Sequence, residues 1–330
     1  NGYSVKCKRG EYISKDAQFI LGDTKLDLPV YNRPKIKNAS GPYTCDESEI
    51  DFIDFIIGSE GVFGLIIDCR LQLKKRSKSY LDLFILLDSE SMAITLYQYL
   101  LDKFNYDLSQ ISALEYFGYN CQNYMINRDK FFKDKEQVAV YLQVPIFNLS
   151  IERACQDWLN ILLNSNCKIE DSSIYVLNEK RSWDLFFEAR HSIPELALKK
   201  VKELKGISII TDTIVPPKNF NKFLEKAHTL IQNADIEYVL FGHLGDCHLH
   251  FHLIPSEKQK DIALKIYQKI IKISTDLNGV YSAEHGTGKR KKNDFIDCYG
   301  QNAVNQVRHS KLCLDPNMLV NRGNIIDYKC

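Results

Sequence analysis

The pattern of hydrophobic and polar positions changes near residue 76. Residues 1–76 contain short alternating or apolar segments separated by turns, and residues 62–73 are predicted to form a long strand. Beyond a basic stretch at residues 74–78, strand-like and helix-like segments alternate. The pattern therefore predicts a strand-rich first part and a layered second part.

The second part is predicted to be one antiparallel sheet covered by helices, because strands and helices alternate with short connections. Ser89 is predicted to cap one of these helices. The fold class is therefore α+β. The predicted strands are residues 80–87, 113–117, 138–144, 173–177, 207–212, 238–242 and 248–254, and the predicted helices are residues 89–104, 118–127, 150–164, 182–198, 218–233 and 257–275.

Length and charge exclude several classes of protein. With 330 residues the chain is expected to form two units. Lys plus Arg total 43 against 42 for Asp plus Glu, so the charge balance gives no reason to expect a nucleic-acid partner. No apolar run reaches the ~18 residues that a membrane-spanning helix needs.

The ten cysteines contain no CxxC pair and are scattered through apolar segments. This usage predicts reduced thiols in the cytoplasm or an organelle matrix, rather than a disulfide framework or an iron–sulfur ligand set. The chain begins with Asn1 rather than Met. We therefore expect it to be a piece of something longer.

The strongest local signal is the run of histidines in residues 242–252. On a strand, side chains alternate between faces, so His248, His250 and His252 are expected to share one face. A tight turn would bring His243 and His250 to one point, and imidazoles suit zinc and other first-row divalent metals. The alternative is a polar sheet face of unligated histidines.

A second signal is the adjacent pair Glu284 and His285, in a loop with two glycines. A carboxylate beside an imidazole offers a metal ligand and a base, and glycines leave room for a flat cofactor. The alternative is a capped, solvent-exposed turn.

A third signal is the glycine-rich segment at residues 57–66. Glycines next to a strand let backbone amides reach a phosphate or a flavin edge. The segment lacks the GxGxxG spacing of a dinucleotide site, so a plain connection between two strands is the alternative.

Taken in order, the motifs GSEGxxG, an arginine-bearing helix, HxGDxxxH, EHGxG and LDPNxxxNxG resemble the FAD-linked oxidases of the vanillyl-alcohol oxidase superfamily. The chain is most similar to the branch of D-lactate, glycolate and D-2-hydroxyglutarate dehydrogenases, over residues 8–327. The resemblance implies FAD-dependent oxidation of a small 2-hydroxyacid, D-lactate-like, to a 2-oxoacid.

The resemblance also implies residue roles. It makes His243, His250 and Glu284 ligands of a divalent metal, zinc or manganese, that lowers the pKa of the substrate hydroxyl. His285 is then the general base, and hydride passes from the substrate C2 to flavin N5. Arg190 is the implied substrate-binding residue, with a surface arginine on an amphipathic helix as the alternative.

The implied flavin contacts are Gly58, Ser59, Glu60, Gly61, Gly64 and Asn321. Residues 212–217 are interpreted as a structural corner. In domain terms, residues 1–76 would form a partial FAD-binding domain, residues 77–299 the substrate or cap domain, and residues 300–330 a segment returning to the FAD domain.

Two of the chain's four departures from the family bear on the cofactor and the metal. Nothing in residues 1–45 resembles the glycine-rich loop that cradles the FAD diphosphate. The expected partner is therefore a missing N-terminal FAD-binding segment or a separate chain, and the alternative function is a non-catalytic metal-binding or interaction remnant. His248 stands where the family usually has Asn, so a third imidazole near the metal is also open.

Overall fold

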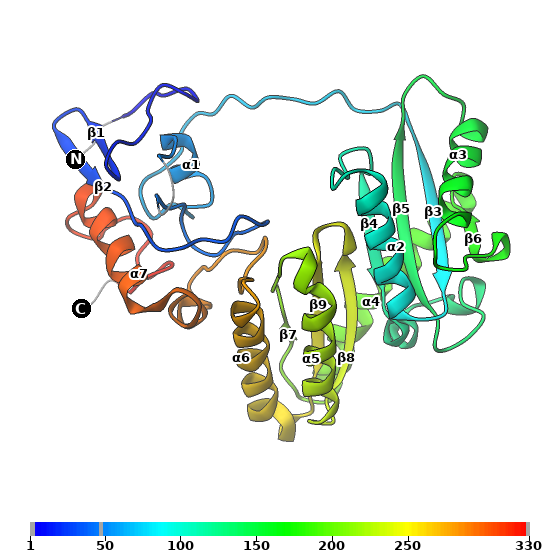
Figure 1. Ribbon diagram of the computed structural model, residues 1–330. Helices are drawn as coiled ribbons and strands as arrows, with labels where there is room; N and C mark the ends of the chain where they lie inside the picture. The colour runs from blue at the N-terminus through cyan, green and yellow to red at the C-terminus, as the bar shows by residue number, and fades with distance from the viewer. Residues whose placement is uncertain (1–3, 46–48, 328–330) are drawn as a thin grey trace. The chain divides into compact units, whose positions relative to one another are not determined.

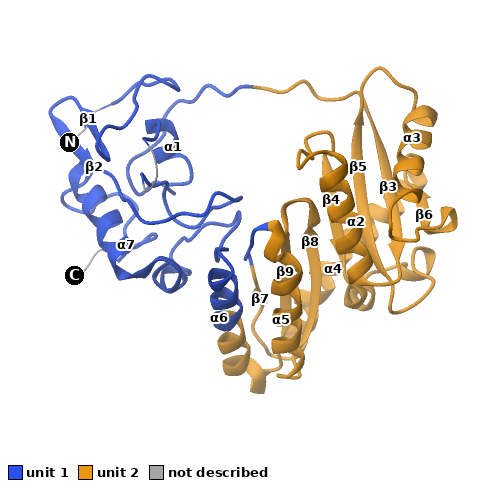
Figure 2. Ribbon diagram, viewed as in Figure 1, with its two compact units in different colours: residues 1–72, 212–216, 268–330 blue, residues 73–211, 217–267 orange. Residues whose placement is uncertain are grey.

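The computed structural model describes residues 4–45 and 49–327. The chain divides into two compact units (Figure 2). The first unit contains residues 1–72, 212–216 and 268–330, and the second contains residues 73–211 and 217–267. Residues 268–299, placed with the cap domain on sequence grounds, group with the first unit. The functional assignment of the predicted domains stays a prediction.

The second unit is built on a seven-stranded sheet in the order β6-β3-β5-β4-β8-β9-β7 (Figure 1). Every neighbouring pair is antiparallel. The predicted α+β class, with an antiparallel sheet covered by helices, is confirmed. The strands are β3 (Ser79–Leu87), β4 (Ala113–Phe117), β5 (Val138–Ile146), β6 (Ile174–Val176), β7 (Ile209–Ile210), β8 (Glu237–His243) and β9 (His248–Ile254).

Helices cover both faces of this sheet. Phe84 of β3 and Phe117 of β4 contact Phe186 of α4 on one face, with ring centroids 5.4 and 6.2 Å apart. Phe251 of β9 contacts Phe223 of α5 on the other. The helices of this unit are α2 (Glu90–Lys103), α3 (Ile151–Leu163), α4 (Lys180–Glu203), α5 (Phe220–Gln232) and the first part of α6 (Lys260–Asp276).

Helix α4 follows from the spacing of its apolar residues. Phe186, Ala189, Ile193, Ala197 and Val201 are all buried, and their separations of three or four residues place them on one helix face. Arg190, the predicted substrate-binding residue, follows Ala189 and lies at the border of this face. The packing of α4 against the sheet therefore fixes where that guanidinium can reach.

The prediction of a strand-rich first part is wrong, because the described residues before residue 77 form only two short strands. A hairpin of β1 (Gln18–Leu21) and β2 (Thr24–Asp27) lies beside α7 (Lys292–Leu314), and α1 (Phe52–Ile56) carries buried Phe52 and Phe55 (Figure 1). Helix α7 is interrupted at Gly300, whose φ of 82° is the left-handed region that glycine tolerates. The second part of α6 completes this unit.

Two predicted elements differ in the structure. Residues 62–73 form no strand, because a strand needs a hydrogen-bonded neighbour and none of the described residues provides one there. The predicted helix at residues 118–127 is a 3-10 turn, Tyr119–Tyr124, tied to β8 because Asn120 Oδ1 accepts from Leu240 N at 3.2 Å.

None of the helices in the described part of the chain combines the length and apolar character needed to cross a membrane. The predicted location in the cytoplasm or an organelle matrix stays a prediction.

We expect Phe186→Ala to destabilise the second unit by about 3–5 kcal/mol, because it removes a fully buried ring that contacts Phe84, Phe117 and Tyr141. Phe187→Ala is the matched control: the neighbouring ring is 48% exposed, and its loss should cost under about 1 kcal/mol. Urea unfolding followed by circular dichroism measures both. Equal losses would contradict this description of the core.

Candidate functional site

Three histidines converge where β8 meets β9. Strand β8 ends at His243 and β9 begins at His248, and the two residues are paired across the strands, as are Phe241 and His250. The ring centroid of His243 lies 5.6 Å from that of His248 and 6.0 Å from that of His250. Each ring offers a nitrogen within 4.8 Å of the others. The arrangement could hold a metal ion.

Gly242 is required by this approach of the two strands. A Cβ atom there would lie 2.8 Å from the His248 carbonyl oxygen and 3.1 Å from Cδ2 of His250. Its φ of 142° also lies in a region that other residues rarely adopt. The glycine before the first histidine of the motif thus allows the imidazoles to gather.

Glu115 connects His243 to Arg190. Strand β4 pairs with β8 so that Glu115 lies opposite His243, and Glu115 Oε1 accepts from His243 Nδ1 at 2.9 Å. Its other oxygen accepts from Arg190 Nη2 of α4 at 3.3 Å. Burial acts to raise the pKa of Glu115, but the hydrogen bond and charge of His243, with Arg190, outweigh it and lower that pKa. The carboxylate is therefore held ionised.

Both predicted histidine ligands have their tautomers set by their neighbours. The Thr211 carbonyl oxygen can only accept, so His250 Nδ1, 2.8 Å away, carries a proton. The ionised carboxylate of Glu115 can also only accept, so His243 Nδ1 carries a proton as well. In each neutral ring the lone pair is then on Nε2, the arrangement found in metal-binding histidines.

In the first unit, a buried carboxylate organises the predicted catalytic loop. Asp212 is fully buried and accepts from the backbone nitrogen of His285 at 3.0 Å and from that of Glu284 at 3.3 Å. It also accepts from Ser282 Oγ at 2.5 Å and from Lys291 Nζ at 2.9 Å. Asp212 was interpreted from sequence as part of a structural corner. The structure shows that it fixes the loop's backbone.

The side chains of this loop are more open. His285 is 51% exposed, and its Nδ1 lies 3.7 Å from Asp212 Oδ1. Glu284 Oε2 lies 2.9 Å from Lys37 Nζ, and Glu284 Oε1 is 3.6 Å from His285 Nε2. The half-exposed imidazole therefore has a carboxylate oxygen within 4 Å of each ring nitrogen.

Glu60 joins the predicted flavin-contacting turn to two other segments of the first unit. Its carboxylate accepts from the backbone nitrogens of Thr287 and Gly288, at 2.6 and 2.8 Å, and from Asn324 Nδ2 at 2.7 Å. Asn321 Nδ2 donates to the Glu60 carbonyl oxygen at 2.5 Å. Three motifs that are far apart in sequence therefore meet at Glu60.

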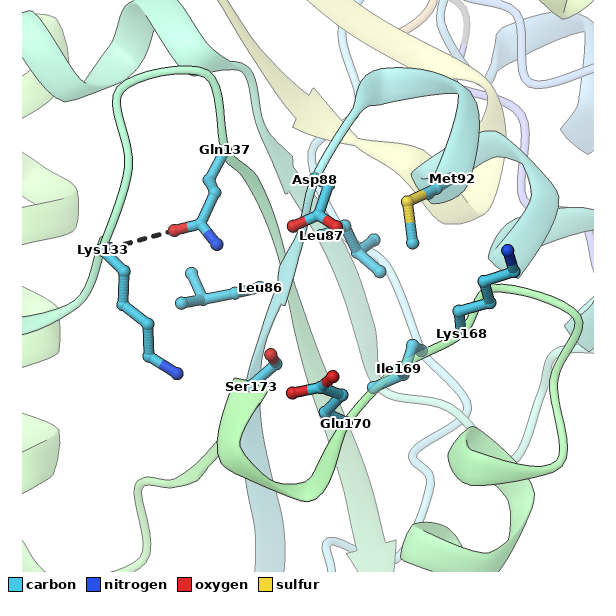
Figure 3. Close-up of a pocket in the computed structure, with 10 residues that line it drawn as sticks. All are labelled: Leu86, Leu87, Asp88, Met92, Lys133, Gln137, Lys168, Ile169, Glu170 and Ser173. Carbon is cyan, nitrogen blue, oxygen red and sulfur yellow. Dashed lines mark hydrogen bonds between the residues drawn. The ribbon is translucent and has the colours of Figure 1, made fainter.

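A cavity of about 250 Å³ lies elsewhere in the second unit, beside the end of β3 (Figure 3). Asp88 and Glu170 line it together with Lys133 and Lys168. It contains none of the predicted site residues, and its lining of both charge signs indicates no particular ligand.

Sequence reasoning missed several residues of these clusters, among them Glu115, Asp212 and Asn324. Glu115 did leave a signal, because it is the one carboxylate in the apolar strand β4. Asp212 likewise follows the apolar strand β7 and is buried. A carboxylate in an apolar strand needs a buried partner, and this is the feature that could have singled them out.

The comparisons with known proteins decide the family. Residues 111–325 match the sequence profile of the FAD linked oxidases, C-terminal domain. The chain belongs to this family. The match covers the three histidines, Arg190 and the loop of Glu284 and His285.

Among the curated relatives, two illustrate the similarity in sequence. A D-lactate dehydrogenase of Archaeoglobus fulgidus is 26% identical over 153 residues, 46% of this chain and 33% of the relative. An uncharacterised FAD-linked oxidoreductase of Mycobacterium tuberculosis is 28% identical over 286 residues, 83% of this chain and 58% of the relative. The chain thus spans between a third and three fifths of their lengths.

A solved structure of p-cresol methylhydroxylase with substrate bound shares the fold. The TM-score is 0.55 at 10% identity, and the match covers 76% of this chain and 53% of that one. The predicted membership of the FAD-linked oxidases is confirmed by the sequence profile, and the solved structure supports the predicted fold.

Asp212→Asn should destabilise the first unit by about 3–5 kcal/mol, because Lys291, whose side chain is 17% exposed, would lose its charge partner. The matched control is Asp276→Asn, which breaks an exposed pair with Lys272 and should cost under about 0.5 kcal/mol. Urea unfolding compares them. A loss for Asp212→Asn no larger than the control's would show that the carboxylate does not organise this loop.

Proposed function

We propose that this FAD-linked oxidase oxidises a small 2-hydroxyacid, D-lactate-like, to the 2-oxoacid, using a divalent metal and His285 as base. The observation that carries the proposal is that His243 and His250 share one sheet face with Glu115, and that Arg190 of α4 reaches Glu115 over the same face. The D-lactate dehydrogenase among the relatives supports the substrate class.

The residues present fit a metal ion. His243 and His250 both present Nε2 lone pairs, and an ionised carboxylate on Nδ1 raises the basicity of His243 as a ligand. We assign Glu284 as the third ligand, which completes a His₂Glu set of the kind that binds catalytic zinc. When bound, zinc or manganese would supply the positive charge that favours ionisation of a substrate hydroxyl.

Arg190 is assigned to the substrate carboxylate. Its Nη2 donates to Glu115, and its side chain remains 36% exposed. A guanidinium presents five donors in a fixed fork, so one contact with Glu115 leaves others for a carboxylate. Glu115 would then orient both the arginine and a metal-binding histidine.

His285 is assigned to accept the proton of the substrate hydroxyl. Its backbone is held by Asp212, whose carboxylate also lies near Nδ1, so the position of the imidazole is fixed for proton transfer. Exposure of about half the side chain lets the ring reach a substrate and return the proton to water.

The turn around Glu60 is assigned to the flavin. The carboxylate of Glu60 already accepts from the backbone nitrogens of Thr287 and Gly288. The backbone of the turn is therefore assigned to contact the flavin. A Cβ at Gly58 or Gly64 would meet no atom within 4 Å, so these positions are open to a flat group. When bound, FAD supplies the electron acceptor.

A partner polypeptide, or a missing N-terminal segment, is assigned to complete the FAD site. In support, residues 65–73 expose five large hydrophobic side chains along an extended segment that forms no strand among the described residues. An extended apolar segment without a neighbour is a surface to which another strand can add. The exposed residues are Leu65, Ile66, Ile67, Leu71 and Leu73.

Purified without chelator, the wild-type chain is expected to carry about one zinc or manganese ion at the histidine cluster, as a three-ligand catalytic site does. His243→Ala should lower the total metal content by about one ion per chain, because one of the two imidazole ligands is lost. His191→Ala, an exposed histidine on α4, is the control and should keep it. Metal analysis by mass spectrometry measures all three, and equal metal in wild type and His243→Ala would sink the assignment.

We expect Arg190→Lys to lower kcat/KM for the 2-hydroxyacid about 10- to 100-fold, because an ammonium cannot reproduce the two-pronged contact. Arg181→Lys, exposed at the start of α4, should leave it unchanged. The assay is bleaching of bound flavin by D-lactate or glycolate under anaerobic conditions, in the chain together with its FAD-binding part. Metal uptake with no bleaching by any 2-hydroxyacid would instead favour the non-catalytic metal-binding alternative.

A further inference from the structure

A second group of metal-ligating side chains lies in the first unit and shares no residue with the histidine cluster. Asp27, His309 and Cys313 each offer one ligand atom, and these atoms lie within 4.8 Å of one another. His309 Nε2 is 2.8 Å from Asp27 Oδ2. A carboxylate, an imidazole and a thiol are the three kinds of side chain that zinc binds in proteins.

The fold positions these residues in two pieces. Strand β2 ends at Asp27, beside α7 (Figure 1). His309 and Cys313 are four residues apart in α7, so they lie on the same helix face, one turn apart. A pair of ligands at this spacing on a helix, with a third from another element, is a recurring way to bind zinc.

The helix face is held against the hairpin by contacts on either side of the cluster. Gln306 Oε1 accepts from the backbone nitrogen of Val30 at 2.8 Å. Val307 and Ser310 are fully buried, as is Leu26 of β2. The backbone of both pieces is therefore fixed, so little ordering would be needed before an ion binds.

The side chains themselves can adjust. In a tetrahedral zinc site, a nitrogen and an oxygen ligand lie about 3.3 Å apart, against 2.8 Å between His309 and Asp27 here. The side chains of His309 and Asp27 are 63% and 36% exposed, so a change of this size needs only rotation of surface groups. Three protein ligands would leave the fourth position to water.

We propose that Asp27, His309 and Cys313 bind a first-row divalent cation, zinc in the first instance, and that the ion ties α7 to the β1–β2 hairpin. This site is independent of the proposed hydroxyacid oxidation, whose assigned ligands include no thiolate. The difference in ligand chemistry allows the two sites to be told apart.

Cobalt(II) is the probe, because a cobalt ion bound to a cysteine thiolate shows an intense near-ultraviolet charge-transfer band that histidine and carboxylate ligands do not give. Titrating the metal-free His243→Ala chain with cobalt under reducing conditions should produce this band. The band should saturate at about one ion per chain, and added zinc should abolish it by displacing the cobalt.

In the same background, Cys313→Ser and His309→Ala should each lose the band, while Cys155→Ser, a partly exposed helical cysteine outside the cluster, should keep it. Circular dichroism checks that all variants are folded. Absence of the band in the His243→Ala chain, or its persistence in Cys313→Ser, would overturn the proposal. Loss of metal at the histidine cluster leaves this result unaffected, so the two proposals can fail separately.

Discussion

The hydrogen bond between Glu115 and His243 is the interaction on which the rest of the site in the second unit depends. It places a partly buried, ionised carboxylate on Nδ1 of one histidine and brings the guanidinium of Arg190 to the same group. The sheet register makes this possible, because β4 and β8 pair with Glu115 opposite His243. A strand slip of one residue would turn Glu115 to the other face and separate all three groups.

In the first unit, carboxylates likewise hold the assigned residues in place by hydrogen bonds. The carboxylates of Asp212 and Glu60 accept hydrogen bonds from backbone amides of the segment around Glu284 and His285. Each such hydrogen bond satisfies a backbone N–H group and restricts the conformation of the loop. The loop thus presents a half-exposed imidazole on a fixed backbone, which suits a residue assigned to accept a proton. In both units the assigned residues are supported by carboxylates that have no assigned role in the chemistry.

The sequence allowed the alternating sheet and helices to be predicted closely, and β4 has the predicted bounds. It also allowed the histidines of β9 to be placed on one face, because strand periodicity is local. It could not give the partners of these residues. Glu115 and His243 are 128 positions apart, and Asp212 and His285 are 73 apart, so their contacts follow from the pairing of distant segments rather than from any local pattern. The strand predicted at residues 62–73 failed for a related reason, since pairing requires a neighbour that no local pattern supplies.

The central claim is that Glu115 prepares His243 to bind a metal ion, and zinc affinity tests it most directly. Isothermal titration calorimetry of the metal-free chain and of Glu115→Gln should show zinc binding about 10- to 100-fold weaker in the variant, because a neutral amide no longer fixes the tautomer or raises the basicity of the imidazole. Equal affinities at the site that His243→Ala removes would contradict the account.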